Sequence, residues 1–268
     1  MDYYSPAHWN NVYARPARPV AGKARHWLRE TVMAEVGRAI PAGGTLLDVA
    51  CGDGFLATGV PGRIHAVGAD FSASAIALAH SAAPSRTWLQ ADATSLPLAD
   101  RTVDVAVCVC GLWAIADPPA SVAELARVLR PGGTAVLHLW SRAQDCRLIT
   151  LGAAALAKTT SAMLLPASAI GPFDLSRDLV EDWAVTAGLN SIRWTRQEID
   201  IVVTNVEQYW AELSGVASTA YTHYQALLPQ QRQNVDETAW NGVLAIQSPM
   251  SHIVTVPLAS QLMIARRV

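Results

Sequence analysis

Lysine is scarce in this chain, and the basic residues form no stripe. Only Lys23 and Lys158 occur, and the 20 basic residues are outnumbered by 22 acidic ones. The arginines are scattered and form no basic stripe, whereas nucleic-acid binding relies on clustered Lys and Arg that neutralise phosphates. The composition therefore argues against a nucleic acid as partner.

Long apolar runs are missing as well. The longest, Leu148 to Ala157, falls far short of the roughly 20 residues that cross a bilayer, and we interpret it as a buried or cap helix. The N-terminus, Met1 to Asn10, is aromatic and polar and lacks the basic and apolar regions of a signal peptide. We therefore expect no membrane insertion and a cytoplasmic location.

Cysteines are few, and their spacing does not fit a metal cluster. The chain has Cys51, Cys108, Cys110 and Cys146, and no second pair accompanies the close pair at zinc-site spacing. We expect no metal site and interpret these residues as buried free thiols in a reducing compartment.

What the chain does have is enough apolar residues, 51% of the total, to bury a sizeable core. From residue 45 onward, short apolar runs alternate with helical stretches, which implies a parallel sheet covered on both faces. The last two strands would form a hairpin at one sheet edge, with the helices between them inserted as a cap. The expected strands are 45–50, 64–69, 87–90, 103–110, 134–140, 192–203 and 254–264.

Helical periodicity and capping residues predict the segments between these strands. Ser72 is a suitable N-cap for one of them, and Pro41 to Gly44 ends the first. Helices are expected over 21–40, 73–83, 120–129, 175–188 and 206–228, with a continuation over 230–245 and a start at 55–60.

The sharpest local signal is the segment Asp48-Val-Ala-Cys-Gly-Asp-Gly54, which follows a strand. Two glycines one residue apart let a backbone approach a ligand closely, although a tight turn without a ligand would look the same. Asp70 ends the next strand, where a carboxylate can accept both hydroxyls of a ribose. NAD enzymes and other adenosine binders share this spacing, so it does not choose between them.

Further motifs distinguish between these classes of adenosine-binding protein. Three more segments follow residues 47–54 in order: 68–72 (GADFS), 90–98 (QADATSLPL) and 124–133 (ELARVLRPGG). Together the four segments cover about residues 40 to 140. In them the chain resembles the class I S-adenosylmethionine-dependent methyltransferases, in the small-molecule branch of ubiquinone/menaquinone-type C-methylases (methyltransferase type 11). The resemblance implies a Rossmann-like, doubly wound α/β fold: a mostly parallel seven-stranded sheet with an antiparallel C-terminal edge strand and a helical cap. It implies an N-terminal helical cover over 1–40, a cofactor-binding core over 41–204 and 252–268, and a cap or substrate lid over 205–251.

The resemblance also implies roles for individual residues. The loop 48–54 would hold the methionine end of S-adenosylmethionine. Asp70 would take the ribose and Phe71 would pack on the adenine. Asp92 and Ala93 would read the adenine edge, and residues 110–111 would line the path to the sulfonium. The implied cofactor-binding residues are Asp48, Cys51, Gly52, Gly54, Asp70, Phe71, Asp92, Ala93, Cys110 and Gly111.

The chain departs from the family after its fourth strand, where many relatives carry a His-His pair. Trp113 and Ala114 stand there instead, so any role of those histidines is absent. Trp113 could form an aromatic wall beside the sulfonium or pack in the core. The candidate acceptor-site residues are Tyr4, His8, Trp113, Trp140, Tyr221 and His223, although packing of cap against body explains the aromatic ones equally well.

No catalytic residue follows from the sequence. Methyl transfer is an in-line displacement that mainly needs alignment and exclusion of water, and a base is needed only where the nucleophile must lose a proton. His8, His138, His223 and His252 are candidates, and each is as readily explained as an ordinary core or surface histidine.

The leading hypothesis is therefore methyl transfer from S-adenosylmethionine, with S-adenosylhomocysteine as product, to a small, largely apolar or aromatic acceptor. A protein of this fold that binds the cofactor but catalyses another reaction, such as cyclisation, is the alternative, as is a partner-binding module. A nicotinamide-dependent dehydrogenase would leave Asp92 and the turn Arg130 to Gly133 unexplained. The oligomeric state stays open.

Overall fold

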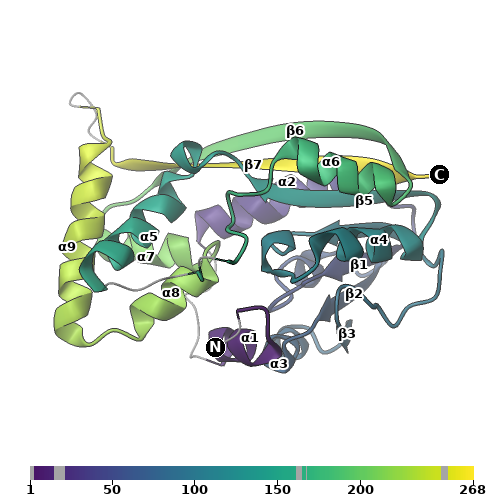
Figure 1. The fold of residues 1–268 in the computed structure, drawn as a ribbon, viewed down its shortest axis with the longest axis horizontal. Coiled ribbons are helices and arrows are strands. Elements are labelled where there is room, and N and C mark those ends of the chain that lie inside the picture. The colour runs from purple at the N-terminus through teal and green to yellow at the C-terminus, as the bar shows by residue number, and fades with distance from the viewer. Residues whose placement is uncertain (1–2, 15–21, 161–164, 167, 249–252) are drawn as a thin grey trace.

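One seven-stranded sheet organises the chain, with strand order β3-β2-β1-β4-β5-β7-β6 (Figure 1). The computed structural model describes residues 3–14, 22–160, 165–166, 168–248 and 253–268. Strands β1 to β5 run parallel, and β7 is antiparallel to both β5 and β6. The strands are β1 Thr45–Val49, β2 His65–Asp70, β3 Thr87–Gln90, β4 Val103–Cys108, β5 Leu129–Trp140, β6 Leu189–Val202 and β7 Thr255–Arg267.

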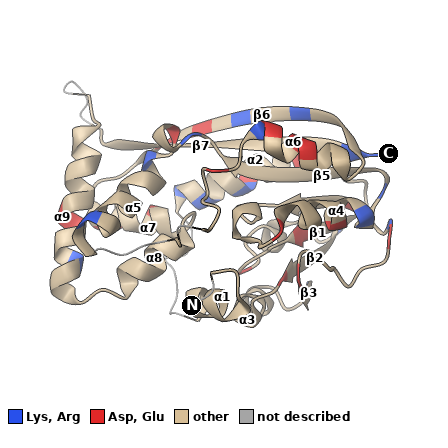
Figure 2. Cartoon of the chain, in the orientation of Figure 1, with Lys and Arg blue, Asp and Glu red and all other residues tan. Residues whose placement is uncertain are grey.

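The predicted fold class is confirmed. The mostly parallel sheet, its antiparallel C-terminal strand and the late hairpin of β6 and β7 are all present. The antiparallel strand β7 lies one position in from the edge, because it returns beside β5 and leaves β6 on its outer side. Charged residues of both signs follow one another along this outer strand (Figure 2).

Helices cover both faces of the sheet and extend beyond one end of it. In Figure 1, α4 and α6 lie in front of the sheet, α2 lies behind it, and α5 and α7 to α9 gather at the far end of β6 and β7. The helices are α1 Pro6–Tyr13, α2 Lys23–Ala39, α3 Ala73–Ala82, α4 Pro118–Val128, α5 Arg147–Thr160, α6 Arg177–Thr186, α7 Val206–Ser214, α8 Ser218–Gln225 and α9 Pro229–Ala245. None of the described helices has the length and hydropathy needed to cross a bilayer.

Two apolar cores follow from this layering. One joins the sheet to α2, α5 and the inserted helices, with Leu28, Leu148 and Trp210 fully buried. The other lies under α4 and α6, around Leu125 and Val180. Apolar alternation along β5 feeds both cores, since successive side chains of a strand point to opposite faces.

Two predicted helices are wrong in extent. Residues 55–60 contain only the short 3-10 helix η1, Ala57–Gly59. The helix expected over 206–228 is two helices, because α7 ends at Ser214 and α8 begins at Ser218. The break matters for the site, since it presents the backbone between α7 and α8 to the interior.

A buried carboxylate joins the inserted helices to the N-terminal part of the chain. Glu212 of α7 is 5% exposed and accepts hydrogen bonds from the backbone N–H groups of Lys23 and Ala24, at 3.0 and 2.9 Å. These are first-turn donors of α2, which have no partner within the helix. A negative charge at that end also suits the helix dipole.

We predict that Glu212→Ala destabilises the chain by about 1–3 kcal/mol, because two buried amide donors lose their acceptor. The measurement is denaturant unfolding followed by circular dichroism. Glu207→Ala is the matched control, since Glu207 lies on the same helix and is exposed. Equal stability of both variants would contradict a capping role.

Candidate active site

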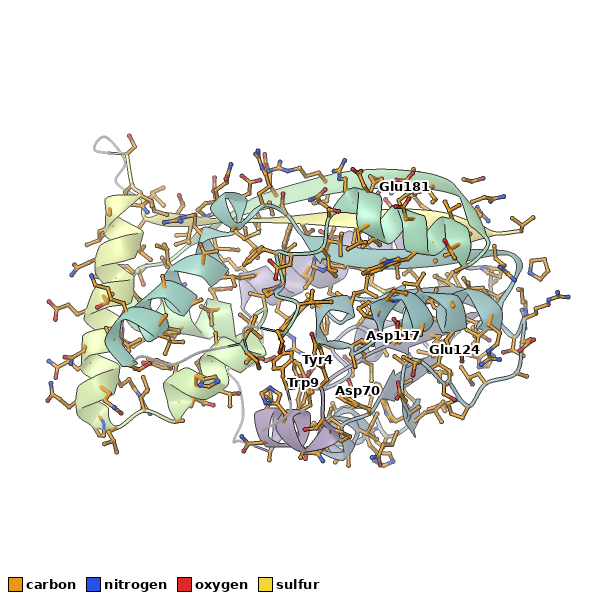
Figure 3. All side chains as sticks on the ribbon, in the orientation of Figure 1. Tyr4, Trp9, Asp70, Asp117, Glu124 and Glu181 are labelled. Atoms are coloured by element: carbon orange, nitrogen blue, oxygen red, sulfur yellow. The ribbon has the colours of Figure 1, made fainter. Side chains whose placement is uncertain are left out.

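A cavity of about 830 Å³ opens at the carboxyl ends of β1 and β4. The strand order reverses between these two strands, so the loops that follow them diverge and leave a crevice. Helix α1, helix α5 and the start of α8 supply the remaining walls. Figure 3 shows Tyr4 and Trp9 together between α1 and the sheet, near Asp70. The volume lies within the range of ordinary ligand pockets, roughly 300–1,000 Å³.

The loops after β1 and β4 both contain a non-glycine residue in the left-handed region. Ala50 and Cys110 each have φ of 57°, and both line the cavity. This conformation costs an L-residue about 1–2 kcal/mol, and such strain gathers at ligand sites. Gly52 also has a positive φ, of 56°, and lines the same cavity without that cost.

Asp70 fixes the glycine loop from the end of β2. Its side chain is 93% buried, as only 7% remains exposed, and it accepts hydrogen bonds from the backbone N–H groups of Gly52 and Ser72, both at 2.9 Å. Burial raises the pKa of Asp70, and the two N–H donors act in the opposite direction. The carboxylate lines the cavity while it holds the loop in shape.

Asp48 and Gly54 lie outside the cavity lining. Asp48 is 2% exposed, and burial together with the charges of Asp70 and Asp53 raises its pKa well above the ordinary value. Gly54 has φ of 76°, and a Cβ there would meet the Trp88 ring at 2.5 Å. The lack of a side chain at Gly54 thus leaves room for Trp88. Direct contact of Asp48 and Gly54 with a cofactor stays a prediction.

The other predicted cofactor residues lie along the cavity wall. Asp92 is exposed, and its Oδ1 accepts hydrogen bonds from the backbone N–H and the hydroxyl of Thr94, both at 2.8 Å. This is an Asx-type turn, so Asp92 also serves the structural role that such residues ordinarily have. The predicted cofactor residues in the lining are Cys51, Gly52, Asp70, Phe71, Asp92, Ala93, Cys110 and Gly111.

The acceptor-site predictions divide into two groups. Tyr4, Trp113 and Trp140 line the cavity, and the Tyr4 hydroxyl accepts a hydrogen bond from the Ile170 N–H at 2.8 Å. His8, Tyr221 and His223 do not line it.

Two of these outlying residues, His8 and Tyr221, pack against other aromatic rings. His8 packs against Tyr3 and Trp9 with ring centroids 4.8 and 5.4 Å apart. Tyr221 stacks on Tyr224, which stacks on Trp210, so this face of α8 packs within the inserted helices. Cap packing thus explains Tyr221, and His252 lies outside the described residues.

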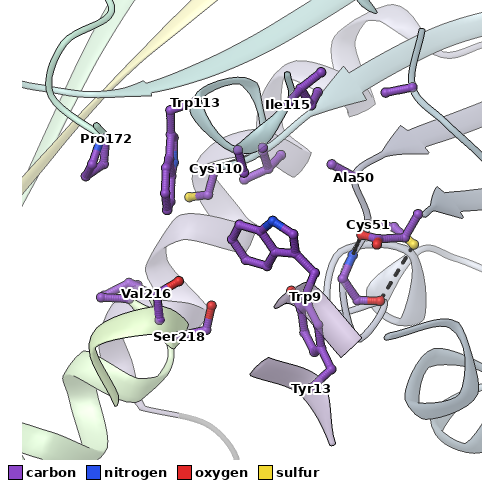
Figure 4. A pocket seen from close by; sticks show the side chains of 18 of the residues that line it. Trp9, Tyr13, Ala50, Cys51, Cys110, Trp113, Ile115, Pro172, Val216 and Ser218 are labelled. Atoms are coloured by element: carbon purple, nitrogen blue, oxygen red, sulfur yellow. Dashed lines mark hydrogen bonds between the residues drawn. The ribbon is translucent and has the colours of Figure 1, made fainter. Parts of the chain in front are cut away.

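Several lining residues were not among the predicted site residues, although the aromatic N-terminal segment was expected to cover the cofactor. Trp9 and Tyr13 come from α1, and Figure 4 shows Trp9 beside Cys110 and opposite Trp113. The alanines of α5 at 153, 154 and 157 also line the cavity, and they lie on one side of the helix, since 153 and 157 are four residues apart and 154 and 157 are three apart.

Arg25 is a further lining residue and carries a positive charge into the cavity wall. Its guanidinium lies 2.5 Å from the Asp53 carboxylate of the glycine loop and 4.8 Å from the centroid of the Phe55 ring. Both side chains of the ion pair are mostly buried. The pair therefore ties α2 to the glycine loop at a cavity wall.

A cysteine and a histidine meet below the cavity. The Cys110 sulfur lies 3.5 Å from His138 Nδ1, and His138 packs edge-on against Trp140. Burial lowers the pKa of His138 to about 3 and raises that of the Cys110 thiol, so both groups are neutral near pH 7. The neutral, buried imidazole of His138 therefore packs behind Cys110, which lines the cavity.

Comparison with known proteins agrees with this geometry. Residues 47–137 match the family model described as "Methyltransferase domain". Residues 47–137 are therefore similar to a methyltransferase domain. The sheet has the Rossmann-like arrangement of solved methyltransferase structures.

Curated relatives share this domain. The chain is 36% identical over 118 residues to a 2-phytyl-1,4-naphtoquinone methyltransferase from Thermosynechococcus vestitus, covering 41% of this chain and 52% of that one. It is 34% identical over 121 residues to a demethylmenaquinone methyltransferase from Renibacterium salmoninarum, covering 45% and 50%. The chain thus spans about half the length of these relatives.

Among solved structures, the YcgJ protein of Bacillus subtilis has a similar fold, with a TM-score of 0.57 at 17% identity, covering 90% of this chain and 98% of that one. At such low identity the likeness concerns the fold. It extends well beyond residues 47–137 and includes the late strands of the sheet.

We predict that Gly52→Ala weakens binding of S-adenosylhomocysteine at least about tenfold. The new Cβ would meet the Tyr13 hydroxyl at 2.5 Å and hold a positive φ, which also costs about 1–2 kcal/mol of stability. Calorimetric titration measures the affinity, and denaturant unfolding measures the stability.

Gly43→Ala is a matched control for the backbone strain. Gly43 has φ of 73°, and a Cβ there meets nothing within 4 Å. This variant should lose stability and keep its affinity for S-adenosylhomocysteine. Equal loss of affinity in both variants would show that the loop near Gly52 has no special part in binding.

A second prediction concerns pH and stability. The pKa of His138 is about 3 in the folded chain and about 6.5 in an unfolded one. The stability that the neutral imidazole contributes is therefore fully present above pH 6.5 and is lost as the pH falls toward 3. Its loss approaches about 1.4 kcal/mol per pH unit within that window.

Unfolding free energies between pH 4 and 7 test this point. His138→Leu should show a shallower loss of stability on acidification than the unchanged chain. His65→Gln is the control, because His65 is exposed on β2 and its replacement should leave the slope as it was. An unaltered slope in His138→Leu would contradict the prediction.

Proposed function

We propose that this chain transfers a methyl group from S-adenosylmethionine to a small, largely apolar or aromatic acceptor bound in the same cavity. The observation that carries the proposal is the cavity itself. Its lining joins the glycine loop and Asp70 to an apolar region with Trp113 and Trp140. One enclosure thus offers a polar end for a nucleoside and an apolar end for an acceptor.

The residues present fit the cofactor. Gly52 has no side chain and lines the cavity beside Tyr13. Asp70 also lines it, and its buried carboxylate would accept the two ribose hydroxyls. Phe71 offers a ring face for a base. Arg25, held by Asp53, is placed in the lining as a partner for a carboxylate. When bound there, S-adenosylmethionine supplies an electrophilic methyl group.

The chain's own residues then provide alignment and exclusion of water. Aromatic residues of α1 and alanines of α5 line the cavity that Cys110 also lines. Exclusion of water by such walls would favour a displacement between two aligned groups. The proposal includes a division of the chain into three parts: a cover over 1–40, a core over 41–204 and 252–268, and a cap over 205–251. It also includes a cytoplasmic location.

The relatives favour a flat, quinone-type acceptor. Two of them are named as methyltransferases of a phytylated naphthoquinone and of demethylmenaquinone, and the apolar side of the cavity suits such rings. The experiment is to bind S-adenosylhomocysteine by calorimetry and then to supply S-adenosylmethionine with reduced 2-phytyl-1,4-naphthoquinone. Mass spectrometry should find a methylated product.

Two outcomes would redirect the proposal. Absence of S-adenosylhomocysteine binding would contradict it. Tight binding without methylation of the quinol, or of any compound from a cell extract, would favour the alternative of a cofactor-binding protein with another reaction, such as a cyclisation.

We also predict that Asp70→Ala weakens S-adenosylhomocysteine binding by about 1–3 kcal/mol, because charged hydrogen bonds are lost and the Gly52 amide is released. Asp92→Ala should weaken binding less, since Asp92 is exposed. Asp100→Ala is the control, as Asp100 is exposed and lies outside the cavity lining. An unchanged affinity in both Asp70→Ala and Asp92→Ala would place the nucleoside elsewhere.

A further inference from the structure

Strand β6 forms one edge of the sheet and has a neighbouring strand on one side only. It pairs with β7, and in Figure 1 it runs along the upper border of the molecule. Within the described part of the chain, no backbone hydrogen bond joins residues 190–202 to any element other than β7. Alternate residues of β6 therefore present unpaired N–H and C=O groups outward.

The two edges of the sheet differ in how they are protected. The opposite edge strand, β3, is 4 residues long, whereas β6 is 14 residues long. Proteins usually protect an exposed edge by a short strand, by proline or lysine, or by a bulge. Residues 193–202 contain neither proline nor lysine, and the register shift of β6 lies before them, between Asn190 and Arg193. This part of β6 is therefore a regular edge on which another strand can pair.

The charges along β6 complement those of the same strand in the reverse direction. Arg193 and Arg196 come first, and Glu198 and Asp200 follow (Figure 2). Two antiparallel copies centred on Gln197 place Arg196 of each copy opposite Glu198 of the other, because residues equally far from the centre face each other. Opposite charges in such positions stabilise an antiparallel pair.

Both charged side chains are accessible to a neighbouring strand. The side chain of Glu198 is 68% exposed and that of Arg196 is 40% exposed. Within one chain Arg196 contacts Glu198 and lies 3.5 Å from Asp145, so pairing between copies exchanges one surface ion pair for another. The charges thus select the register, while backbone hydrogen bonds would hold the two strands together.

We propose that β6 pairs with β6 of a second copy of this chain, antiparallel and centred on Gln197. Facing residues must lie on the same face of the sheet, so the two-fold axis passes through a residue and not between two. Registers centred on Arg196 or on Glu198 bring like charges together, which disfavours them. The assembly closes as a dimer, because each copy has one long edge. The inference is independent of the proposed function, since no residue of β6 lines the cavity.

A cysteine at the centre of the pair tests the register. Gln197 is exposed, and Gln197→Cys places the two new thiols opposite each other, within reach of a disulfide. Mild oxidation should therefore give a linked dimer on a non-reducing gel. Asn190→Cys is the matched control, because Asn190 is exposed on the same strand and its two copies would lie at opposite ends of the pair. The unchanged chain reports any link through its own cysteines.

Sedimentation velocity measures the association itself. The unchanged chain should form a dimer whose population rises with concentration. Arg196→Glu and Glu198→Arg each put like charges across the pair and should raise the dissociation constant at least about tenfold. The double variant Arg196→Glu/Glu198→Arg should restore the association. Glu237→Arg is the charge control, since Glu237 is exposed on α9, and it should leave the association unchanged.

Three results would overturn the inference, with circular dichroism showing that each variant is folded. The first is an unchanged chain that stays monomeric at every concentration. The second is equal cross-linking of Gln197→Cys and Asn190→Cys. The third is a dimer that neither single charge variant weakens, which would place the interface elsewhere on the molecule.

Discussion

The geometry of the site depends on one carboxylate. Asp70 accepts hydrogen bonds from the amides of Gly52 and Ser72, so the end of β2 fixes the loop after β1 and the start of α3 together. The Ser72 hydroxyl in turn accepts from Ala75 as an N-cap and donates to Asn10 of α1. A single chain of hydrogen bonds thus runs from the end of β2 to helix α1, which lines the cavity. Because its members are mostly buried, each one is costly to leave unpaired.

The inserted helices are positioned by a second buried carboxylate. Glu212 of α7 caps α2, and Gly215 follows directly after α7 with so little room that a Cβ would meet Arg25 at 2.9 Å. The same Arg25 is paired with Asp53 of the glycine loop. The cap, the N-terminal helices and the loop therefore share contacts, and the small residues between α7 and α8 line the cavity as a consequence.

Local signals predicted most of the fold, and tertiary packing decided what they missed. Ser72 was recognisable as a cap because a hydroxyl before a helical run has few other roles. The glycine turn and Asp70 could also be predicted, because both follow directly after apolar strands in the sequence. Which face of a short helix meets a cavity is not a local property. Tyr221 packs toward Tyr224 on α8, whereas the neighbouring Thr219 and Ala220 face the cavity.

Contacts with residues distant in sequence also explain the role of Gly54 and the short extent of the helix expected after it. Gly54 belongs to the motif, yet its small size is required by Trp88, which is distant in sequence. Residues 55–60 form little helix, since Arg25 packs over Phe55 and Thr58 bonds back to the Phe55 carbonyl. The sequence pattern showed a turn and a helical start, and only the packed neighbours decide how far each extends.

The cavity has a charged side and an apolar side. Asp53, Asp70, Asp92 and Asp117 line it with the guanidinium of Arg25, whereas the walls near Trp113 and Trp140 are apolar. Acidic side chains favour a cationic ligand at one end, and apolar walls weaken the screening of charge at the other. Under the proposed function, a cationic methyl donor would meet the acceptor at the apolar end. Both products would be neutral only where the acceptor is an anion or gives up a proton as it receives the methyl group. Neutral His138 behind Cys110 fits this reading, since a charged imidazole there would oppose the cation.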